Sequence, residues 1–330
     1  MTPAQLQQPK IELHVHLEGT VRPGLLAAIA RDHGLTPPAG RPPDSFTDLH
    51  DFIDRWNTVS GYLRTPADYR RALLAYAAEA AGHGAVYLEP ILDAEERFGG
   101  PDGWADVLAA CCDAAAEARE RYAVEIGLTP QVFRGQDVDV AEEAARVAVR
   151  FAGRGVVGFG LSGAEGRHPT EPYARAVGIA RGGGLPFVPH AGEAAGPDAV
   201  REVLAMGAAR IRHGVRAVDD PDLVTELVGR GVVLDVTPTS NLRLGVARPD
   251  RPHPVTRLAE AGVRCSVSTD DPAIFDVTLA DEYALAGRLG VDPAAAWAAG
   301  LAGALCDDAT RTRLAALGDR AYGRAPAVSA

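Results

Sequence analysis

The sequence predicts a (β/α)8 barrel of the TIM type with a helical insertion after the first strand. Short apolar runs alternate along the chain with Ala- and Arg-rich segments of helical period, and eight such runs occur. Regular strand–helix alternation is typical of a parallel sheet, and eight units favour a closed barrel over an open sheet. No G-x-G-x-x-G or G-x-x-x-x-G-K-[ST] sequence follows any run. The usual mark of an open nucleotide-binding sheet is therefore missing.

The eight runs are short enough to be buried strands and are separated by segments of helical length. In chain order, the expected strands are 11–16, 85–90, 124–130, 156–162, 186–190, 210–214, 232–238 and 264–270. Segments such as 103–122 and 140–155 carry apolar residues three and four positions apart, and glycine follows several of them. This spacing predicts amphipathic helices that end at a glycine and cover the strands.

Residues 17–84 form a connection too long for a simple crossover. The connection contains an initial helical pattern, the proline-rich stretch LTPPAGRPPD and a second helical pattern that includes Phe46, Leu49, Phe52, Ile53 and Trp56. An insertion after the first strand rises on the face where barrel active sites lie. Two interpretations stay open: a cap over the pocket, or a small core of its own. We treat residues 1–330 as one domain, because a barrel of this type needs about 250 residues or more.

Composition excludes several classes of function. The formal net charge of −11 argues against binding to nucleic acid or anionic membranes, which requires a basic face. The four cysteines form no C-x-x-C pair, so neither a disulfide framework nor a thiolate zinc site is expected. The first residues lack the pattern of a signal peptide, and no apolar run reaches about 18 residues. We expect a cytoplasmic protein with a small-molecule partner and leave its oligomeric state open.

Polar side chains gather at the C-terminal ends of four predicted strands. The first strand ends in HVH, the fifth runs into HAGE, the sixth ends in RIRHG and the eighth ends in TDDP. His14 and His16 are two residues apart and therefore face the same side of their strand. Pointing inward, they would converge with His190, His213 and Asp270, a donor set that zinc favours.

Each fragment alone also has a simpler interpretation. A lone H-x-H is more often a pair of hydrogen-bonded histidines, and acids after strands commonly cap the next helix. Four fragments at the same end of correctly ordered strands favour the metal site. The remaining histidines lie in helical or loop segments and are expected to be solvated; they are His33, His50, His83, His168 and His253.

The convergent residues suit hydrolytic attack on an unsaturated carbon. A bound zinc ion lowers the pKa of water to about 7, which makes hydroxide available at neutral pH. A neutral histidine beside the metal can accept or orient the proton of that water. A nearby carboxylic acid can protonate the substrate as it is attacked, and a second aspartate can accept a hydrogen bond from it.

The motifs HVHLEGT, HAGE, RIRHGV and STDDP, in this order, resemble those of the adenosine deaminase family of the amidohydrolase superfamily. The resemblance extends from about residue 10 to residue 290, and the four motifs together are highly specific. It implies a (β/α)8 barrel that holds one Zn²⁺ per chain and releases ammonia from C6 of a purine. The ligands implied are His14, His16, His190 and Asp270.

The same resemblance assigns the catalytic and substrate-binding residues. Glu193 matches the acid that protonates purine N1, and His213 matches the histidine that positions the attacking water. Asp271 matches the residue that pairs with N7, and Gly163 matches the glycine whose backbone N–H meets N3. Substrate-binding positions therefore include His16, Glu18, Gly163 and Asp271.

Two departures concern the part of the substrate attached to N9. Glu18 and Gly160 stand where adenosine deaminases usually carry aspartate, whereas Gly163 is retained. A purine C6 reaction is expected on adenosine or on a 5′-modified nucleoside such as 6-amino-6-deoxyfutalosine. A deaminase of free adenine and another mononuclear amidohydrolase are the alternatives.

Three other classes of protein fit less well. His16 and Glu18 match the H-x-E half of a different zinc deaminase, but the P-C-x-x-C half is absent. Amidohydrolases with two metals often use a carboxylated lysine bridge, and Lys10 is the only lysine. A non-catalytic binding protein is disfavoured because every catalytic position is filled.

Overall fold

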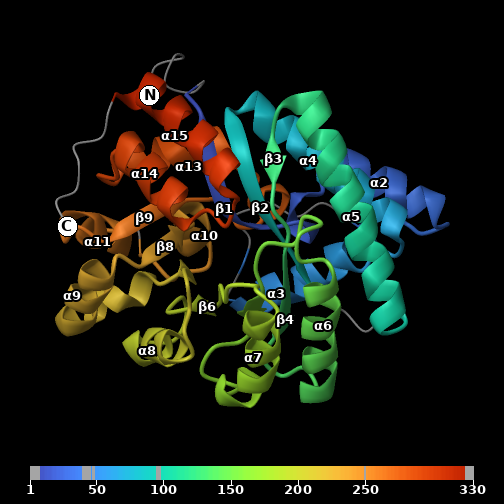
Figure 1. The fold of residues 1–330 in the computed structure, drawn as a ribbon, viewed down its shortest axis with the longest axis horizontal. Coiled ribbons are helices and arrows are strands. Elements are labelled where there is room, and N and C mark those ends of the chain that lie inside the picture. Colours follow the sequence, from blue (N-terminus) through green and yellow to red (C-terminus); the bar gives the residue numbers. More distant parts are fainter. Residues whose placement is uncertain (1–7, 39–45, 47–48, 94–97, 249, 324–330) are drawn as a thin grey trace.

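The computed structural model describes residues 8–38, 46, 49–93, 98–248 and 250–323, and the strands lie inside a surround of helices (Figure 1). The strands are β1 (Lys10–His16), β2 (Ala85–Asp93), β3 (Glu125–Ile126), β4 (Thr129–Phe133), β5 (Gly160–Ser162), β6 (His190–Ala191), β7 (Ile211–His213), β8 (Val233–Val236) and β9 (Arg264–Val267). Each of the eight predicted runs contains a strand, and the run 124–130 divides between β3 and β4.

All strand pairs are parallel and form two curved sheets. The first has the order β1-β2-β4-β5, with β3 also paired to β2, and the second has the order β6-β7-β8-β9. A backbone bridge from Phe159 to Phe187 joins the sheets on one side, and a bridge from Val15 to Asp270 joins them on the other. The predicted barrel is therefore confirmed.

The second join brings the beginning of the barrel to its end. The His16 N–H donates to the Asp270 carbonyl at 2.8 Å, and the Asp270 N–H donates to the His14 carbonyl at 3.1 Å. By contrast, β6 has only two residues, because Pro186 and Pro189 in the same run have no N–H to donate.

The helices lie between the strands in chain order and, from α12 on, after the last strand. They are α2 (Pro23–Asp32), α3 (Leu49–Ser60), α4 (Pro66–Gly82), α5 (Pro101–Tyr122), α6 (Val138–Arg150), α7 (Ala174–Gly182), α8 (Pro197–Ala205), α9 (Pro221–Arg230), α10 (Pro238–Arg243), α11 (Pro254–Glu260), α12 (Pro272–Phe275), α13 (Leu279–Arg288), α14 (Pro293–Gly303) and α15 (Asp308–Tyr322). Short 3-10 helices are η1 (Glu18–Thr20), η3 (Glu171–Tyr173) and η4 (Val215–Asp219). None of the helices in these ranges is both long and apolar enough to cross a bilayer.

Local sequence explains where many helices start. Proline at the first turn and a polar residue before it recur, as in α4, where Thr65 and Asp68 form a reciprocal capping box. Asp220 and Asp292 likewise cap α9 and α14 with their side chains. These signals determine the residue at which each of these helices begins. A large core of buried apolar residues packs between the strands and the helices.

Helices α2, α3 and α4 lie between β1 and β2, in the range where a helical insertion was expected. In α3 the aromatic side chains face the barrel: Phe52 stacks on Phe275 with ring centroids 5.2 Å apart, and Trp56 lies edge-on to His16 at 6.3 Å. These contacts favour a wall of the pocket over a separate small core. The role of residues 17–84 as a cap stays a prediction.

Candidate active site

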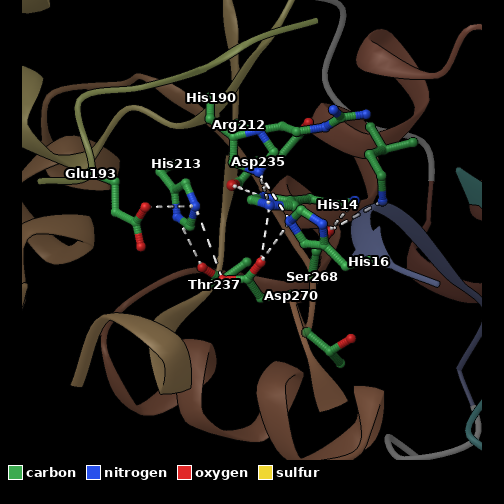
Figure 2. Close-up of polar contacts among 12 residues, drawn as sticks. His14, His16, His190, Glu193, Arg212, His213, Asp235, Thr237, Ser268 and Asp270 are labelled. Carbon is green, nitrogen blue, oxygen red and sulfur yellow. Dashed lines mark hydrogen bonds and ion pairs between the residues drawn. The ribbon is translucent and has the colours of Figure 1, made fainter. Parts of the chain in front are cut away.

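Four strand ends bring the predicted polar residues to one place (Figure 2). His14 and His16 belong to β1, His190 begins β6, His213 ends β7, and Asp270 follows β9 at the bridge to Val15. A bulge in β1 helps to aim the two histidines, because the Ser268 hydroxyl accepts N–H groups from both Leu13 and His14. His213 and Asp270 have left-handed backbones, with φ of 63° and 66°, a conformation common at functional sites.

The side-chain atoms of the four predicted metal ligands converge. His190 Nε2 lies 3.1 Å from His14 Nε2 and 3.2 Å from His16 Nε2. Asp270 Oδ1 lies 3.1 Å from His14 Nε2 and 3.5 Å from His16 Nε2. His213 is close as well, because His14, His190, His213 and Asp270 can each offer an atom within 4.8 Å of the others.

Burial sets the charge of this cluster. It lowers the pKa of His14, lowers that of His190 well below the usual value and lowers that of His213 to about 3, so these rings are neutral. Burial opposes ionisation of Asp270, but the histidines around it, with His14 the largest contributor, together hold the Asp270 pKa below the usual range.

His16 differs: burial alone would lower its pKa, but the nearby acids Asp271, Asp93 and Asp270 raise it to about 9. A bound cation would take the place of the proton on that ring. The neutral imidazoles of His14 and His190 and the carboxylate of Asp270 offer lone pairs at close range, and buried lone pairs require a proton or a cation. The donor set therefore fits a zinc ion.

The second nitrogen of each of three rings faces a partner that fixes its orientation. His14 Nδ1 lies 3.3 Å from the Asp235 carbonyl, and His213 Nδ1 lies 3.2 Å from the Thr237 hydroxyl. His16 Nδ1 lies 3.7 Å from Asp93 Oδ2. Such partners orient histidines that bind metals. Sequence reasoning missed Asp93 because the second predicted strand stopped at Pro90, whereas β2 continues to Asp93.

A cavity of about 400 Å³ opens beside the cluster. Residues of α3 supply an apolar side, and Arg134, Arg167 and His168 supply a basic side. The predicted site residues that line it are His16, Gly163, His190, Glu193, His213, Asp270 and Asp271.

Two acids in the cavity have strongly shifted pKa values. Burial, with Asp270 nearby, raises the pKa of Glu193 well above its usual value and so favours the protonated carboxyl. Glu193 Oε2 lies 3.5 Å from His213 Nε2. Burial also raises the pKa of Asp271 well above the usual range. A β-carbon on Gly19 would lie 1.9 Å from Asp271 Oδ1, so the glycine of the HLEGT motif makes room for this carboxyl group.

Glu18 does not line the cavity. Its Oε1 accepts hydrogen bonds from the Tyr69 hydroxyl at 3.0 Å and from the Asp93 N–H at 3.2 Å, and the residue is fully buried. Glu18 thus supports Asp93, and its contact with a substrate stays a prediction. Gly163 has φ of 91°, and a β-carbon there would lie 2.9 Å from the Arg134 backbone nitrogen, so glycine is required.

The expectation that the remaining histidines are solvated was wrong for His253. It is buried, and its Nδ1 accepts the Val255 N–H at the start of α11. A capping role in a loop gives no periodic signal, so the sequence did not reveal it. His33 is half-buried against Asp68 at 2.8 Å, and His168, although exposed, lines the cavity. The His50 side chain lies outside the described part of the structure.

The family model described as adenosine deaminase matches residues 9–316. The chain belongs to the adenosine deaminase family. It is therefore a hydrolytic deaminase, and its membership indicates an adenine-type substrate.

Similar members of the adenosine deaminase family carry different names. An aminodeoxyfutalosine deaminase from Acidothermus cellulolyticus is 43% identical, covering 94% of this chain and 91% of the relative. An adenine deaminase from Rhizobium leguminosarum bv. trifolii is 38% identical over 94% of this chain and 95% of its own. Among solved structures, an adenine deaminase from Arthrobacter aurescens has a TM-score of 0.84 at 28% identity, covering 94% of this chain and 98% of that one.

A solved amidohydrolase from Burkholderia ambifaria, with bound Zn, has a TM-score of 0.83 at 25% identity. It covers 98% of this chain and 96% of its own. This likeness agrees with the metal-dependent character of the adenosine deaminase family.

Proposed function

We propose that this protein is a zinc-dependent enzyme that deaminates C6 of an adenine nucleoside and releases ammonia. The observation that carries the proposal is the convergence of three imidazoles and Asp270 beside the cavity that Glu193 lines. One Zn²⁺ per chain would be held by His14, His16, His190 and Asp270. When bound, zinc supplies Lewis acidity that makes water a competent nucleophile near neutral pH.

His16 is a better candidate for the ligand set than His213. The Nε2 of His16 lies 3.2 Å from His190 Nε2 and 3.5 Å from Asp270 Oδ1. His213 can offer an atom within 4.8 Å of His14, His190 and Asp270, but its Nε2 lies 4.0 Å from Asp270 Oδ2 and faces Glu193 Oε2 at 3.5 Å. We therefore propose that His213 accepts or holds a proton of the attacking water.

Glu193 would act as the general acid. Its raised pKa favours the protonated carboxyl group, and that proton passes to N1 of the ring as water adds to C6. Protonation of N1 makes C6 more electrophilic, and the electrons of the C6–N1 double bond move to N1 as oxygen adds to C6. The amino group then takes up the proton that His213 received from water. The C6–N bond breaks as the C6=O bond forms, the hydroxyl proton returns to Glu193, and ammonia leaves.

Asp271 and Gly163 would orient the purine. The buried Oδ1 of Asp271 has no hydrogen-bond partner within the described residues, and the residue lines the cavity. Burial raises the pKa of Asp271 and so favours its protonated form, which can donate to an acceptor such as N7. Gly163, on the wall formed by the loop after β5, would present its N–H to N3.

The cavity also supports a proposal for the N9 substituent. Arg134, Arg167 and His168 give one side of the cavity a basic character, in a chain whose net charge is −11. Aromatic residues of α3 supply an apolar side. An extended substituent that carries a negative group suits this combination, as expected for a 5′-modified nucleoside. The relative named aminodeoxyfutalosine deaminase makes 6-amino-6-deoxyfutalosine the leading candidate.

Two other substrates compete. Plain adenosine satisfies the C6 chemistry equally well, and the relatives named adenine deaminase favour free adenine. The test compares kcat/KM for 6-amino-6-deoxyfutalosine, adenosine, 5′-deoxyadenosine, methylthioadenosine and adenine, with ammonia as the product measured. We expect the highest kcat/KM for 6-amino-6-deoxyfutalosine. We also expect the active protein to contain about one zinc ion per chain. A preference for adenine would overturn the nucleoside assignment, and absence of ammonia from every compound would overturn the C6 reaction.

A further inference from the structure

The loop that carries Glu193 is held by a carboxylate from the neighbouring loop. Glu165 follows β5, and its Oε2 accepts three consecutive backbone N–H groups, from Glu193 at 3.1 Å, Ala194 at 3.1 Å and Ala195 at 2.9 Å. These residues connect β6 to α8. Three successive N–H groups directed at one oxygen form a concave anion site.

The bonds from Glu165 are of the strong kind. A carboxylate that accepts backbone N–H groups forms charge-assisted hydrogen bonds, which are about twice as strong as neutral ones. Glu165 reaches across from a different strand end, so these bonds link two loops and do not merely shape one. Glu165 is not among the residues that line the cavity, so it is placed to act on Glu193 without touching substrate.

Arg134 completes the link from the other side. Its Nη2 donates to the His190 carbonyl at 2.9 Å, and its Nη1 donates to the Ser162 carbonyl at 3.2 Å. The strand ends of β5 and β6 are thus joined by one guanidinium and one carboxylate. Gly163 lines the cavity and lies between Ser162 and Glu165 in the sequence. The hydrogen bonds of Arg134 and Glu165 therefore hold the Gly163 N–H in a fixed position relative to the backbone of Glu193.

We infer that Glu165 is a positioning residue for the deamination reaction, which fixes the backbone of Glu193 so that its carboxyl faces the purine ring. The inference rests on the proposed role of Glu193 as the acid. A misplacement of about 1 Å at a reacting group can cost about a hundredfold in rate. An anchored loop is therefore worth more to the reaction than to folding, where three exposed or half-buried N–H groups could bond to water instead.

The first experiment measures hydrogen exchange and does not depend on activity. We expect Glu165→Ala to speed exchange of the amides of residues 193–195 by at least about tenfold, the size expected for the loss of charge-assisted bonds. Glu165→Gln keeps an acceptor oxygen and should lie between Glu165→Ala and the wild type. Glu171→Ala, an exposed glutamate on η3, is the control and should not change. Unchanged exchange in Glu165→Ala would overturn the anchor.

The second experiment is a double-mutant cycle on kcat, with zinc content measured in each variant. Glu165→Ala should lower kcat by at least about tenfold with full metal occupancy, and Glu165→Gln should recover part of the loss. Added to Glu193→Gln, the same substitution should cost little more, because its effect passes through that acid. If the fold-losses in kcat of the two single variants multiply in the double variant, the inference is overturned.

The two experiments distinguish a failure of this inference from a failure of the proposed function. A wild-type protein that releases no ammonia would count against the function, while hydrogen exchange still decides whether Glu165 holds the loop. If Glu165→Ala does not fold, Glu165→Gln and Glu165→Asp carry both measurements. Wild-type exchange and wild-type kcat in those two variants would then overturn the inference.

Discussion

The guanidinium of Arg212 occupies the space that a side chain at position 160 would need: a β-carbon on Gly160 would lie 2.6 Å from Arg212 Nη1. Arg212 crosses the barrel interior to donate to Thr129 and Gln131, and it is fully buried. The glycine at position 160 thus has a structural cause. Space for a buried cation decides this position.

We predict that Gly160→Ala lowers the free energy of unfolding by about 1–3 kcal/mol, the usual cost of overpacking a core. The added methyl group would also contact Gln131, whose Cβ would lie 2.9 Å from the new carbon. Chemical denaturation measures the change. Gly178→Ala is the control: it lies in α7 with open space around it and should stabilise the protein by about 0.5–1 kcal/mol. Equal stability of both variants would contradict the packing argument.

Replacing Glu193 by Gln should separate metal binding from catalysis. Glutamine keeps the size of the side chain but has no acidic proton to give, so turnover should fall by at least about a hundredfold. Zinc content should stay at the wild-type level, because Glu193 is outside the proposed ligand set. Steady-state ammonia release and metal analysis of the same sample provide the measurement. Near-normal turnover would end the assignment of the acid.

Replacing His14 by Ala should weaken metal retention. The ring nitrogen of His14 lies within 3.1 Å of both His190 and Asp270, so its loss opens the centre of the proposed ligand set. Metal analysis after dialysis should show substoichiometric zinc in His14→Ala and full occupancy in the control His83→Ala. Full occupancy in both variants would mean that His14 is not a ligand.

Arg167 offers a test of the negatively charged substituent. It is exposed at the basic side of the cavity, so Arg167→Ala should raise KM for a substrate with an anionic 5′ group by about fivefold, equivalent to about 1 kcal/mol. KM for adenosine should not change. Arg31→Ala, in the last turn of α2, is the control and should change neither value. An equal rise for both substrates would show that Arg167 does not sense the charge.

Glu282 should make folding stability depend on pH. Burial raises its pKa to about 8 from an ordinary value of 4.5, so the native state holds a proton that the unfolded chain releases. Its contribution to stability is present below pH 4.5 and is lost as the pH rises through about 8. Relative to wild type, Glu282→Gln should therefore gain stability between about pH 5 and about pH 8. Chemical denaturation of both proteins at each pH measures the difference in their free energies of unfolding. A difference that does not change with pH would contradict the raised pKa of Glu282.

The barrel and the centre of the site could be predicted because both follow from simple rules. Strand–helix alternation indicates a parallel barrel, and residues at the C-terminal ends of its strands must meet. His14, His190 and Asp270 are of this kind, and the structure brings them together.

Other features depend on contacts between segments whose pairing carries no periodic signal. Glu165 and Glu193 are 28 positions apart in neighbouring loops, and their link has no counterpart in strand or helix periodicity. Gly160 could be noted as unusual, but its reason is Arg212 on another strand. Asp93 could have been predicted as a site residue, because extending the second predicted strand by three residues would have placed it at a strand end.

The backbone bridge between Val15 and Asp270 has a consequence for the order of assembly. The seam where the first and last strands meet is also where His14, His16 and Asp270 come together, so a chain still emerging from the ribosome cannot complete the cluster until residue 270 has left the exit tunnel. A cation bound there would stabilise the contact between the first and last strands. Metal binding and closure of the barrel would then occur together, after synthesis of most of the chain.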